Sequence, residues 1–316
     1  MPLGDSNQKG DGLKTQNIES KNPVDFGRNS HVIISKKSLN SQVTKITFVA
    51  QEIAEKAQAG QFVILRIDEE GERIPLTLFD WTSAEGIKGT ITLIFQHLGV
   101  STKKLAALNV GDKILNVVGP LGNPSCIQNY GVAAIVCGGV GTAAAYPIAK
   151  ALKAAGNKVV SILGARNKEL LILEDEMKAV SDEFYISTDD GSEGQKGFVS
   201  DVLKSLIEKK YQFSIVYAIG PVPMMKATAE VTRSYGIKTI VSLNPIMVDG
   251  MGMCGSCRVT VGGATKFACI DGPEFDAHKT DFKELMSRLK EYPSEEKSAL
   301  AFREKGEGAT CPCSQH

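Results

Sequence analysis

The stretch Asn244–Phe275 reads NPIMVDGMGMCGSCRVTVGGATKFACIDGPEF and holds three of the chain's seven cysteines. Cys254 and Cys257 form a C-x-x-C pair, and Cys269 follows after a short segment rich in β-forming residues. Asp249 stands five residues before Cys254, in a run that contains two glycines. Glycine adopts the tight, positive-φ backbone that lets several ligands converge on one centre. The stretch therefore predicts a loop that gathers three thiolates and one carboxylate.

Two interpretations of this cysteine loop are open from the residues alone. Plant-type [2Fe–2S] sites follow a C-x4-C-x2-C pattern with a distal cysteine, and here Asp249 stands at the first position. Structural zinc sites usually have four Cys or His ligands in paired knuckles, and this stretch has no histidine before His278. The spacing favours an iron–sulfur cluster over zinc or over thiols that are simply buried.

Composition limits the classes of function. The 316 residues include 36 basic and 36 acidic side chains, so the chain has no basic excess that would indicate nucleic-acid binding. No apolar run reaches the ~18 residues of a membrane helix, and the N-terminus has no signal-peptide core. We therefore expect a cytoplasmic protein that binds neither nucleic acid nor a membrane. In that compartment a C-x-x-C pair indicates metal or redox chemistry.

Changes in sequence pattern divide the chain into five parts. Residues 1–30 are polar and aperiodic, and we expect a disordered N-terminal extension. Residues 31–128 contain short strands separated by turn residues, which predicts an antiparallel sheet or small β-barrel. Residues 129–243 alternate apolar strands with helices, which predicts a doubly wound parallel sheet. We assign 244–290 to a small domain around the cysteines and 291–316 to a C-terminal tail.

Three strands of the predicted parallel sheet end in glycine-containing turns. These are Cys137–Thr142 (CGGVGT), Thr188–Gly191 (TDDG) and Gly220–Pro223 (GPVP). The carboxyl ends of strands form the ligand crevice of open α/β sheets, and helix N-termini bind phosphate, so these turns predict a nucleotide site. The first turn lacks the full G-x-G-x-x-G fingerprint, and its glycines could instead serve only the tight packing of strand against helix.

Two motifs in the β-rich part have the residues of a phosphate site. Arg73–Thr77 (RIPLT) follows a strand, and Gly99–Thr102 (GVST) precedes a short helix. A Ser or Thr at a helix start, with free N–H groups, can bind phosphate. The same residues are also compatible with an ordinary helix cap and a solvated surface arginine.

Taken in order, these motifs resemble the ferredoxin–NADP reductase superfamily from about residue 31 to residue 289. The resemblance rests on Gly60-Gln61-Phe62, Arg73–Thr77, Gly119–Gly122, Gly138–Thr142, Thr188–Gly191, Gly220-Pro221 and the cysteine loop. It implies an antiparallel FAD-binding β-barrel, a doubly wound parallel-sheet NAD-binding domain and a small C-terminal [2Fe–2S] domain. The nearer resemblance is to electron-transfer subunits that end in such a cluster, like that of dihydroorotate dehydrogenase.

The cysteine loop narrows the resemblance. Dihydroorotate-linked subunits carry a cysteine where this chain has Asp249. The segments SLNPIMVDGMGMCGSCRVTVGG and KFACIDGPEFDAH resemble instead the small subunit of NADH-dependent reduced ferredoxin:NADP oxidoreductase and the related sulfide dehydrogenase subunit. In those families an aspartate replaces the first cysteine ligand. The resemblance therefore implies a [2Fe–2S] cluster on Asp249, Cys254, Cys257 and Cys269.

The resemblance also implies two sets of cofactor-binding residues and no catalytic residue on the protein itself. The FAD site would contain Arg73, Pro75, Leu76, Thr77, Phe95, Gln96, Ser101, Thr102 and Gly119. The NAD site would contain Gly138, Gly139, Val140, Gly141, Thr142, Gly164, Ala165, Arg166, Asp190, Gly220 and Pro221. The chain departs from the superfamily at Ile74, where an arginine is usual, and at Ile219, where a cysteine is frequent.

By the same resemblance, the chain passes electrons between NAD(H), FAD and a [2Fe–2S] cluster to a larger flavin and iron–sulfur subunit. Ferredoxin is reached through that heteromeric complex, which in the family can bifurcate electrons. NAD is expected over NADP, although Arg166 could meet a 2′-phosphate. The alternatives are a sulfide dehydrogenase or dihydroorotate dehydrogenase electron-transfer subunit, and a zinc-stapled, nucleotide-binding regulatory subunit without catalytic function.

Overall fold

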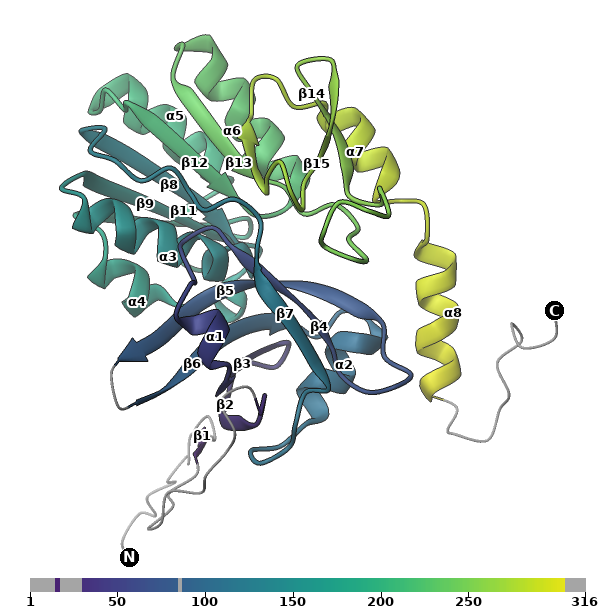
Figure 1. The fold of residues 1–316 in the computed structure, drawn as a ribbon. Helices are drawn as coiled ribbons and strands as arrows, with labels where there is room; N and C mark the ends of the chain where they lie inside the picture. The colour runs from purple at the N-terminus through teal and green to yellow at the C-terminus, as the bar shows by residue number, and fades with distance from the viewer. Residues whose placement is uncertain (1–14, 18–29, 85–86, 305–316) are drawn as a thin grey trace, which may run out of the picture.

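Figure 1 shows the fold in a computed structural model, which describes residues 15–17, 30–84 and 87–304. Most of the predicted N-terminal extension lies outside these residues, as do Cys311 and Cys313 of the tail. Within the extension, β1 (Thr15–Asn17) pairs antiparallel with β2 (Ile33–Asn40).

The first half of the chain forms a seven-stranded antiparallel sheet in the order β1-β2-β3-β6-β5-β4-β7, which is called the barrel below. Its other strands are β3 (Val43–Val49), β4 (Phe62–Arg66), β5 (Arg73–Ala84), β6 (Ile87–Gln96) and β7 (Asn116–Leu121). β-Branched and aromatic side chains suit such strands, and Ile46, Phe48 and Ile91 are among those buried inside. The short helices α1 (Gln51–Ala54) and α2 (Val100–Ala107) lie between strands.

The second sheet has the order β11-β10-β9-β8-β12-β13-β16. Its strands are β8 (Val132–Gly138), β9 (Lys158–Ala165), β10 (Glu183–Thr188), β11 (Gln195–Lys196), β12 (Ile215–Ile219), β13 (Lys238–Ser242) and β16 (Glu274–Asp276). All neighbours are parallel except β13 and β16. The doubly wound parallel sheet predicted from the sequence is therefore present, with an added antiparallel edge.

Helices cover both faces of this sheet (Figure 1). On one face lie α3 (Gly141–Ala154) and α4 (Glu174–Ala179), and on the other lie α5 (Val199–Lys209) and α6 (Val222–Ser234). Alternate residues of β8 enter the two cores: Ala133 and Ile135 pack with α3, and Ala134 and Val136 pack with α5. Burial on both sides explains why β8 is apolar throughout rather than alternating.

The cysteine loop leads into a small hairpin of β14 (Arg258–Val261) and β15 (Ala264–Phe267), turned at two glycines with positive φ. The chain then adds β16 to the edge of the second sheet, where Phe275 pairs with Val241 of β13. It continues as α7 (Phe282–Arg288). The segment 244–290 thus shares a strand with the nucleotide-type sheet, which the sequence did not predict.

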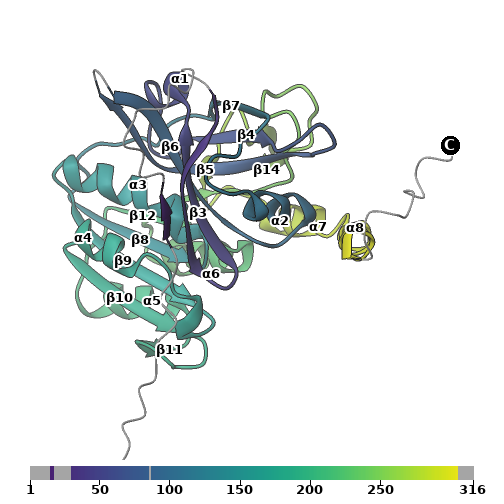
Figure 2. The same ribbon diagram turned by 90° about the horizontal axis from the view of Figure 1, so that it is seen from below.

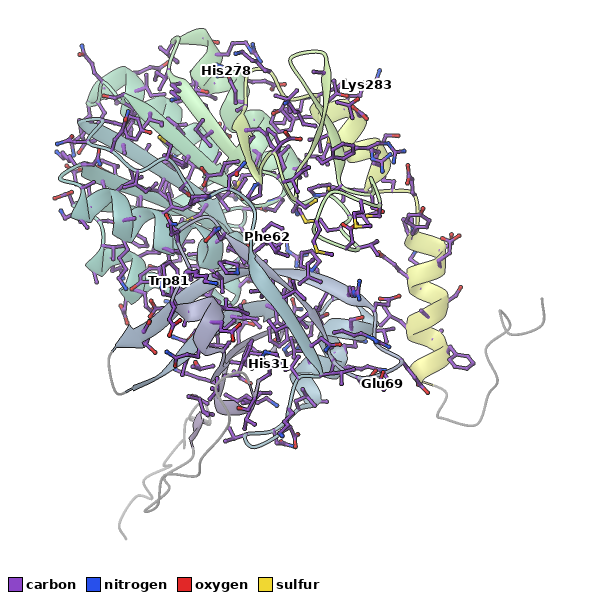
Figure 3. The ribbon with its side chains drawn as sticks, viewed as in Figure 1. His31, Phe62, Glu69, Trp81, His278 and Lys283 are labelled. Atoms are coloured by element: carbon purple, nitrogen blue, oxygen red, sulfur yellow. The ribbon has the colours of Figure 1, made fainter. Side chains whose placement is uncertain are left out.

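The C-terminal tail contains a further helix, α8 (Pro293–Glu304). Figure 2 shows α8 beside α2 at the edge of the barrel, and residues of the two helices are in contact. Figure 3 places Phe62 where the barrel meets the rest of the molecule. There, a Cβ added to Gly122 would lie 2.8 Å from the Phe62 ring and 2.9 Å from Pro273, so barrel and cysteine loop are closely packed.

Candidate cofactor sites

The predicted nucleotide residues meet at the point where the strand order of the parallel sheet reverses. From β8 the chain proceeds through β9 to β10 on one side, and then through β12 to β13 on the other. The crevice at such a switch point is where open α/β sheets bind their ligands. The turn from Gly139 to Thr142 lies between β8 and α3 at this point, and Gly139 N donates to Gly164 O over 3.0 Å.

Close packing explains why glycines end these strands. A Cβ on Gly141 would lie 2.5 Å from Ile219 O, and one on Gly164 would lie 2.4 Å from the Val199 side chain. A Cβ on Gly138 would lie 2.7 Å from Met224 Sδ. The glycines therefore let β8 pack against α6, β9 against α5, and the start of α3 against the end of β12, which agrees with the packing interpretation. Nucleotide binding by these turns stays a prediction.

The loops after β9 and β10 are joined by hydrogen bonds. Asp190 N donates to Arg166 O over 3.3 Å, and the Asp190 carboxylate accepts from the Ser192 hydroxyl and backbone N–H. These bonds from Ser192 lower the pKa of Asp190, which is therefore ionised. Ser192 Oγ in turn accepts from Lys168 N. The structure thus brings Arg166 and Asp190 together at one end of the crevice.

The predicted flavin residues lie on adjacent strands of the barrel. On β5, Pro75, Leu76 and Thr77 pair with Ile64, Val63 and Phe62 of β4. Arg73 is exposed at the start of β5, and within residues 30–84 and 87–304 no acidic side chain pairs with it. Phe95 is buried in the barrel core, so its ring packs inside the sheet and is not exposed to a cofactor. Gln96 lies at the end of the same strand and is partly exposed.

The two hydroxyls predicted to bind pyrophosphate are engaged at the start of α2. Thr102 Oγ1 accepts from Leu98 N and Gly99 N at 3.1 Å, which closes the first turn of the helix. Ser101 Oγ donates to Glu72 Oε2 over 3.0 Å. The position of Glu72 beside this helix was not predicted, because a residue 29 positions earlier in the chain gives no local signal. Gly119 lies on β7, where a Cβ would approach Val63 at 2.7 Å.

The cysteine loop brings two of its four predicted ligands into contact. Cys257 Sγ and Cys269 Sγ are 3.2 Å apart and both are buried, whereas Cys254 is exposed. The separation exceeds the ~2.05 Å of a disulfide, so these are thiols. Among the described residues, no three His, Cys, Asp or Glu side chains lie close enough together to hold a metal ion. Three thiols and a carboxylate on one glycine-rich loop nevertheless suit iron in their donor chemistry.

The buried thiol of Cys269 holds its proton strongly where no positive charge is nearby. Burial raises the pKa of Cys269 to about 12, so the sulfur stays protonated unless positive charge compensates. Iron supplies such charge, since a coordinating thiol is deprotonated by its metal. Cys254 is different: hydrogen bonding from Ser256 lowers its pKa.

Asp249 organises the backbone of the loop. Its Oδ1 accepts from Met251 N over 2.9 Å, and its Oδ2 accepts from Met253 N and Cys254 N over 3.0 and 2.8 Å. These backbone donors, first that of Met251, lower the pKa of Asp249 and keep it ionised. A carboxylate has about four lone-pair sites, so three accepted bonds leave one for a metal.

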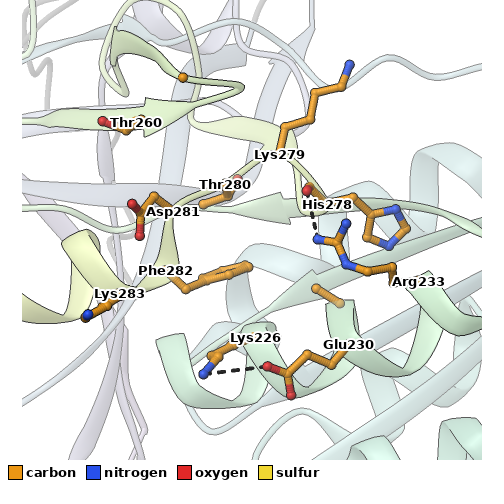
Figure 4. Close-up of a pocket in the computed structure, with 12 residues that line it drawn as sticks. Lys226, Glu230, Arg233, Thr260, His278, Lys279, Thr280, Asp281, Phe282 and Lys283 are labelled. Carbon is orange, nitrogen blue, oxygen red and sulfur yellow. Dashed lines mark hydrogen bonds and ion pairs between the residues drawn. The ribbon is translucent and has the colours of Figure 1, made fainter.

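A separate surface pocket lies between α6 and the segment His278–Lys283 (Figure 4). Arg233 Nη2 donates to His278 O over 2.7 Å, and Lys226 pairs with Glu230 at 3.6 Å. None of the predicted cofactor residues lines this pocket. This pocket is therefore separate from the predicted cofactor sites.

Comparison with known proteins bears on the nucleotide and iron–sulfur parts of the chain. Residues 244–281 match the profile of the iron-sulfur cluster binding domain of dihydroorotate dehydrogenase B, and residues 135–230 match that of the oxidoreductase NAD-binding domain. The dihydroorotate dehydrogenase B (NAD(+)) electron transfer subunit homolog of Thermotoga maritima is 48% identical over 84% of this chain and 92% of its own length. The chain belongs to the dihydroorotate dehydrogenase B electron-transfer subunit family.

Other members of this family, and one solved structure, cover nearly the same span. The electron transfer subunit of Bacillus caldolyticus is 34% identical over 80% of this chain and 98% of its own. A structure described as that of the NADH-dependent reduced ferredoxin-NADP oxidoreductase, studied for flavin-based electron bifurcation, contains a chain that is 45% identical to this one. That chain matches with a TM-score of 0.81 over 87% of this chain and 98% of its own.

Membership of the electron-transfer subunit family confirms the predicted fold class and the prediction of an oxidoreductase subunit with an iron–sulfur cluster, FAD and NAD(H). It favours iron–sulfur over zinc at the cysteine loop. The individual binding residues remain predictions. Within the described part of the chain, no helix is both long and apolar enough to cross a membrane.

Proposed function

We propose that the chain is the small, electron-transferring subunit of a cytoplasmic NADH-dependent reduced ferredoxin:NADP oxidoreductase. The likeness that carries this proposal is the 45% identity, over almost the full length of the other chain, to a chain in the structure of that enzyme. Asp249 in the first ligand position supports it, because the dihydroorotate-linked subunits resembled above carry cysteine there. The runner-up is a dihydroorotate dehydrogenase B electron-transfer subunit, which the names of the matching family members favour.

Each cofactor has its own part of the chain in this proposal. The glycine turn of β8 and α3 and the Arg166–Asp190 loops hold NAD(H), and the β5 motif with the start of α2 holds FAD. The cysteine loop holds the [2Fe–2S] cluster. When bound, FAD exchanges hydride with NAD(H) and single electrons with the cluster, so the chain itself needs no general acid or base.

The face around the cysteine loop suits a partner subunit. Val248, Met251, Met253 and Ile270 are large apolar residues between 47% and 83% exposed, and all lie within the stretch that contains the predicted ligands. Methionine packs adaptably against other proteins. We assign this face to contact with the larger flavin and iron–sulfur subunit, through which electrons continue to ferredoxin.

The proposed function is tested by purifying the full chain with its native partner. We expect a yellow-brown protein with FAD and about two iron atoms per copy of this chain, as one [2Fe–2S] cluster requires. NADH should reduce both cofactors, and the protein should bind NADH more tightly than NADPH. A colourless protein that contains zinc would contradict the cofactor assignment, and tighter binding of NADPH would contradict the nucleotide preference. The identity of the co-purified partner separates the ferredoxin-linked enzyme from the sulfide- and dihydroorotate-linked alternatives.

Replacing Asp249 with cysteine tests whether this carboxylate is a cluster ligand. Cluster potential depends on ligand identity and on hydrogen bonds to the ligands, so Asp249→Cys should retain a [2Fe–2S] absorption spectrum and shift the reduction potential. Asp271→Asn is the matched control, because Asp271 also accepts a loop N–H, from Phe267 over 2.7 Å, but is not a predicted ligand. An unchanged potential and electron paramagnetic resonance signal in Asp249→Cys would rule the ligand role out.

A further inference from the structure

Glu274 lies where the barrel, the parallel sheet and the cysteine loop meet. It begins β16, where it pairs with Ser242 of β13, and its carboxylate accepts a hydrogen bond from Ser125 Oγ in the linker between the two sheets. A Cβ added to Gly60 of the barrel would lie 3.1 Å from Glu274 Oε1. The carboxyl group is therefore enclosed by three parts of the molecule that are distant in sequence.

The groups facing this carboxyl are neutral. From β12 comes Tyr217 and from the linker comes Tyr130, and both hydroxyls donate to Cys126 O, at 3.1 and 2.9 Å. Burial raises the pKa of Tyr217 and raises that of Tyr130 to about 12, so both phenols are neutral at pH 7. The barrel side offers the backbone of Gly60. Within the described residues no Lys, Arg or His pairs with Glu274, so an ionised carboxylate has one hydroxyl donor and no counter-ion.

This lack of a counter-ion sets how readily Glu274 holds a proton. Burial disfavours the charged form, and it raises the pKa of Glu274 to about 7, while the bond from Ser125 acts in the opposite direction. Both protonation states are therefore populated near neutral pH. A small change in nearby charge is enough to shift the balance between them.

Short, hydrogen-bonded stretches of chain connect Glu274 to both proposed redox sites. Cys269 is five residues earlier, and the intervening loop is held to the linker by Asn123, whose Nδ2 and N donate to Ile270 O and Gly272 O over 3.0 and 2.7 Å. On the barrel side, Gly60 is followed by Gln61, whose carbonyl accepts a hydrogen bond from Leu78 N over 3.0 Å. Leu78 follows Thr77 of the predicted flavin site. The chain between Glu274 and each site is therefore packed protein rather than bulk water, a medium in which charges interact more strongly.

We propose that Glu274 is a positioning residue that links proton uptake to electron transfer through the [2Fe–2S] cluster. The proposal rests on the proposed function, which places that cluster at the cysteine loop. One electron, which derives from NADH, adds one negative charge to the cluster, and the Glu274 carboxylate binds one proton from solvent in response. When the electron leaves for the partner, the proton returns to solvent. By linkage, the protonation state of Glu274 must also change the affinity of the cluster for its electron.

The pH dependence of the cluster potential tests this link. Redox titration of the full chain with its cofactors, followed by electron paramagnetic resonance, covers one pH unit on either side of about 7. In the wild type the potential should fall as pH rises, because deprotonated Glu274 adds a negative charge near the cluster. Glu274→Gln keeps an acceptor for Ser125 but cannot ionise, so its potential should be flat over this range. Glu284→Gln, on α7 of the same segment, should behave like the wild type.

A second variant distinguishes titration from a purely structural role. Ser125→Ala removes the bond that favours the carboxylate, so the fall in potential should move to higher pH. Equal pH dependence in the wild type and Glu274→Gln overturns the proposal. If Glu274→Gln loses its cluster, an unshifted profile in Ser125→Ala overturns it instead. Absence of a [2Fe–2S] signal from the wild type would overturn the cluster assignment, and with it this inference, whereas a normal signal without pH dependence overturns this inference alone.

Discussion

The Cys257→Ser variant is expected to lose the [2Fe–2S] signal and to retain far less than the about two iron atoms of the wild type. Cys257 is buried beside Cys269, so a hydroxyl at this position gives a poor ligand for iron and leaves an enclosed polar group. FAD content and reduction of the flavin by NADH should persist, because those residues lie on other elements. Iron analysis and electron paramagnetic resonance of the purified variant measure the result.

Cys126→Ser provides the matched control for this experiment. Cys126 is an exposed thiol in the linker, and its interactions with Tyr130 and Tyr217 use the backbone carbonyl, which the substitution keeps. The control should therefore retain iron. Cys257→Ala, which adds no polar group, separates loss of a ligand from loss of folding. A wild-type cluster signal in Cys257→Ser would contradict the assignment of this residue.

Gly141→Ala is expected to destabilise the protein and to weaken NADH binding together. The added Cβ would lie 2.5 Å from Ile219 O and 2.7 Å from Gly220 Cα, and both contacts are with backbone, which cannot move aside as a flexible side chain can. Overpacking of this kind costs about 1–3 kcal/mol. The same overpacking would displace α3 from the switch point. If this displacement costs NADH binding about 1.4 kcal/mol, the affinity for NADH falls about tenfold. Denaturant unfolding and titration of flavin reduction with NADH measure the two effects.

Gly99→Ala is the control for the effect on stability. Gly99 also stands at the start of a helix, as the N-cap of α2, but nothing lies within 4 Å of its added Cβ and its φ is −108°. Its unfolding free energy should therefore stay close to that of the wild type. If Gly141→Ala is as stable as this control and binds NADH normally, the close packing of the crevice does not limit nucleotide binding.

Much of the fold was predictable because its patterns are local. The continuous apolar run of β8 is typical of a parallel strand that helices cover on both faces. Gly141 is required because the start of α3 packs against the end of β12. By contrast, β16 has three residues, and its pairing with β13 depends on how the cysteine loop returns to the sheet. The helix α8 lies in a charged tail whose pattern did not distinguish a helix from an irregular segment.

The site residues likewise divide into those that the sequence could predict and those that it could not. The strand ends that carry Gly138, Gly164 and Asp190 follow from topology, because neighbouring parallel strands present their carboxyl ends together. Contacts such as Ser101 with Glu72, and Ser125 with Glu274, join residues 29 and 149 positions apart. No spacing in the sequence encodes such a pair. They depend on the packing of whole elements, and the structure was needed to find them.

The antiparallel pairing of β16 with β13 has a consequence for how this protein can be divided or fused. An uncovered strand at a sheet edge presents unpaired N–H and C=O groups that attract other chains. The cluster-bearing segment covers that edge with β16, so the boundary suggested by the motifs, near residue 243, cuts through a continuous hydrogen-bonded sheet. A nucleotide-binding fragment that ends there would need another strand over β13 to remain monomeric. The cluster segment is thus an integral part of the sheet and not a portable module.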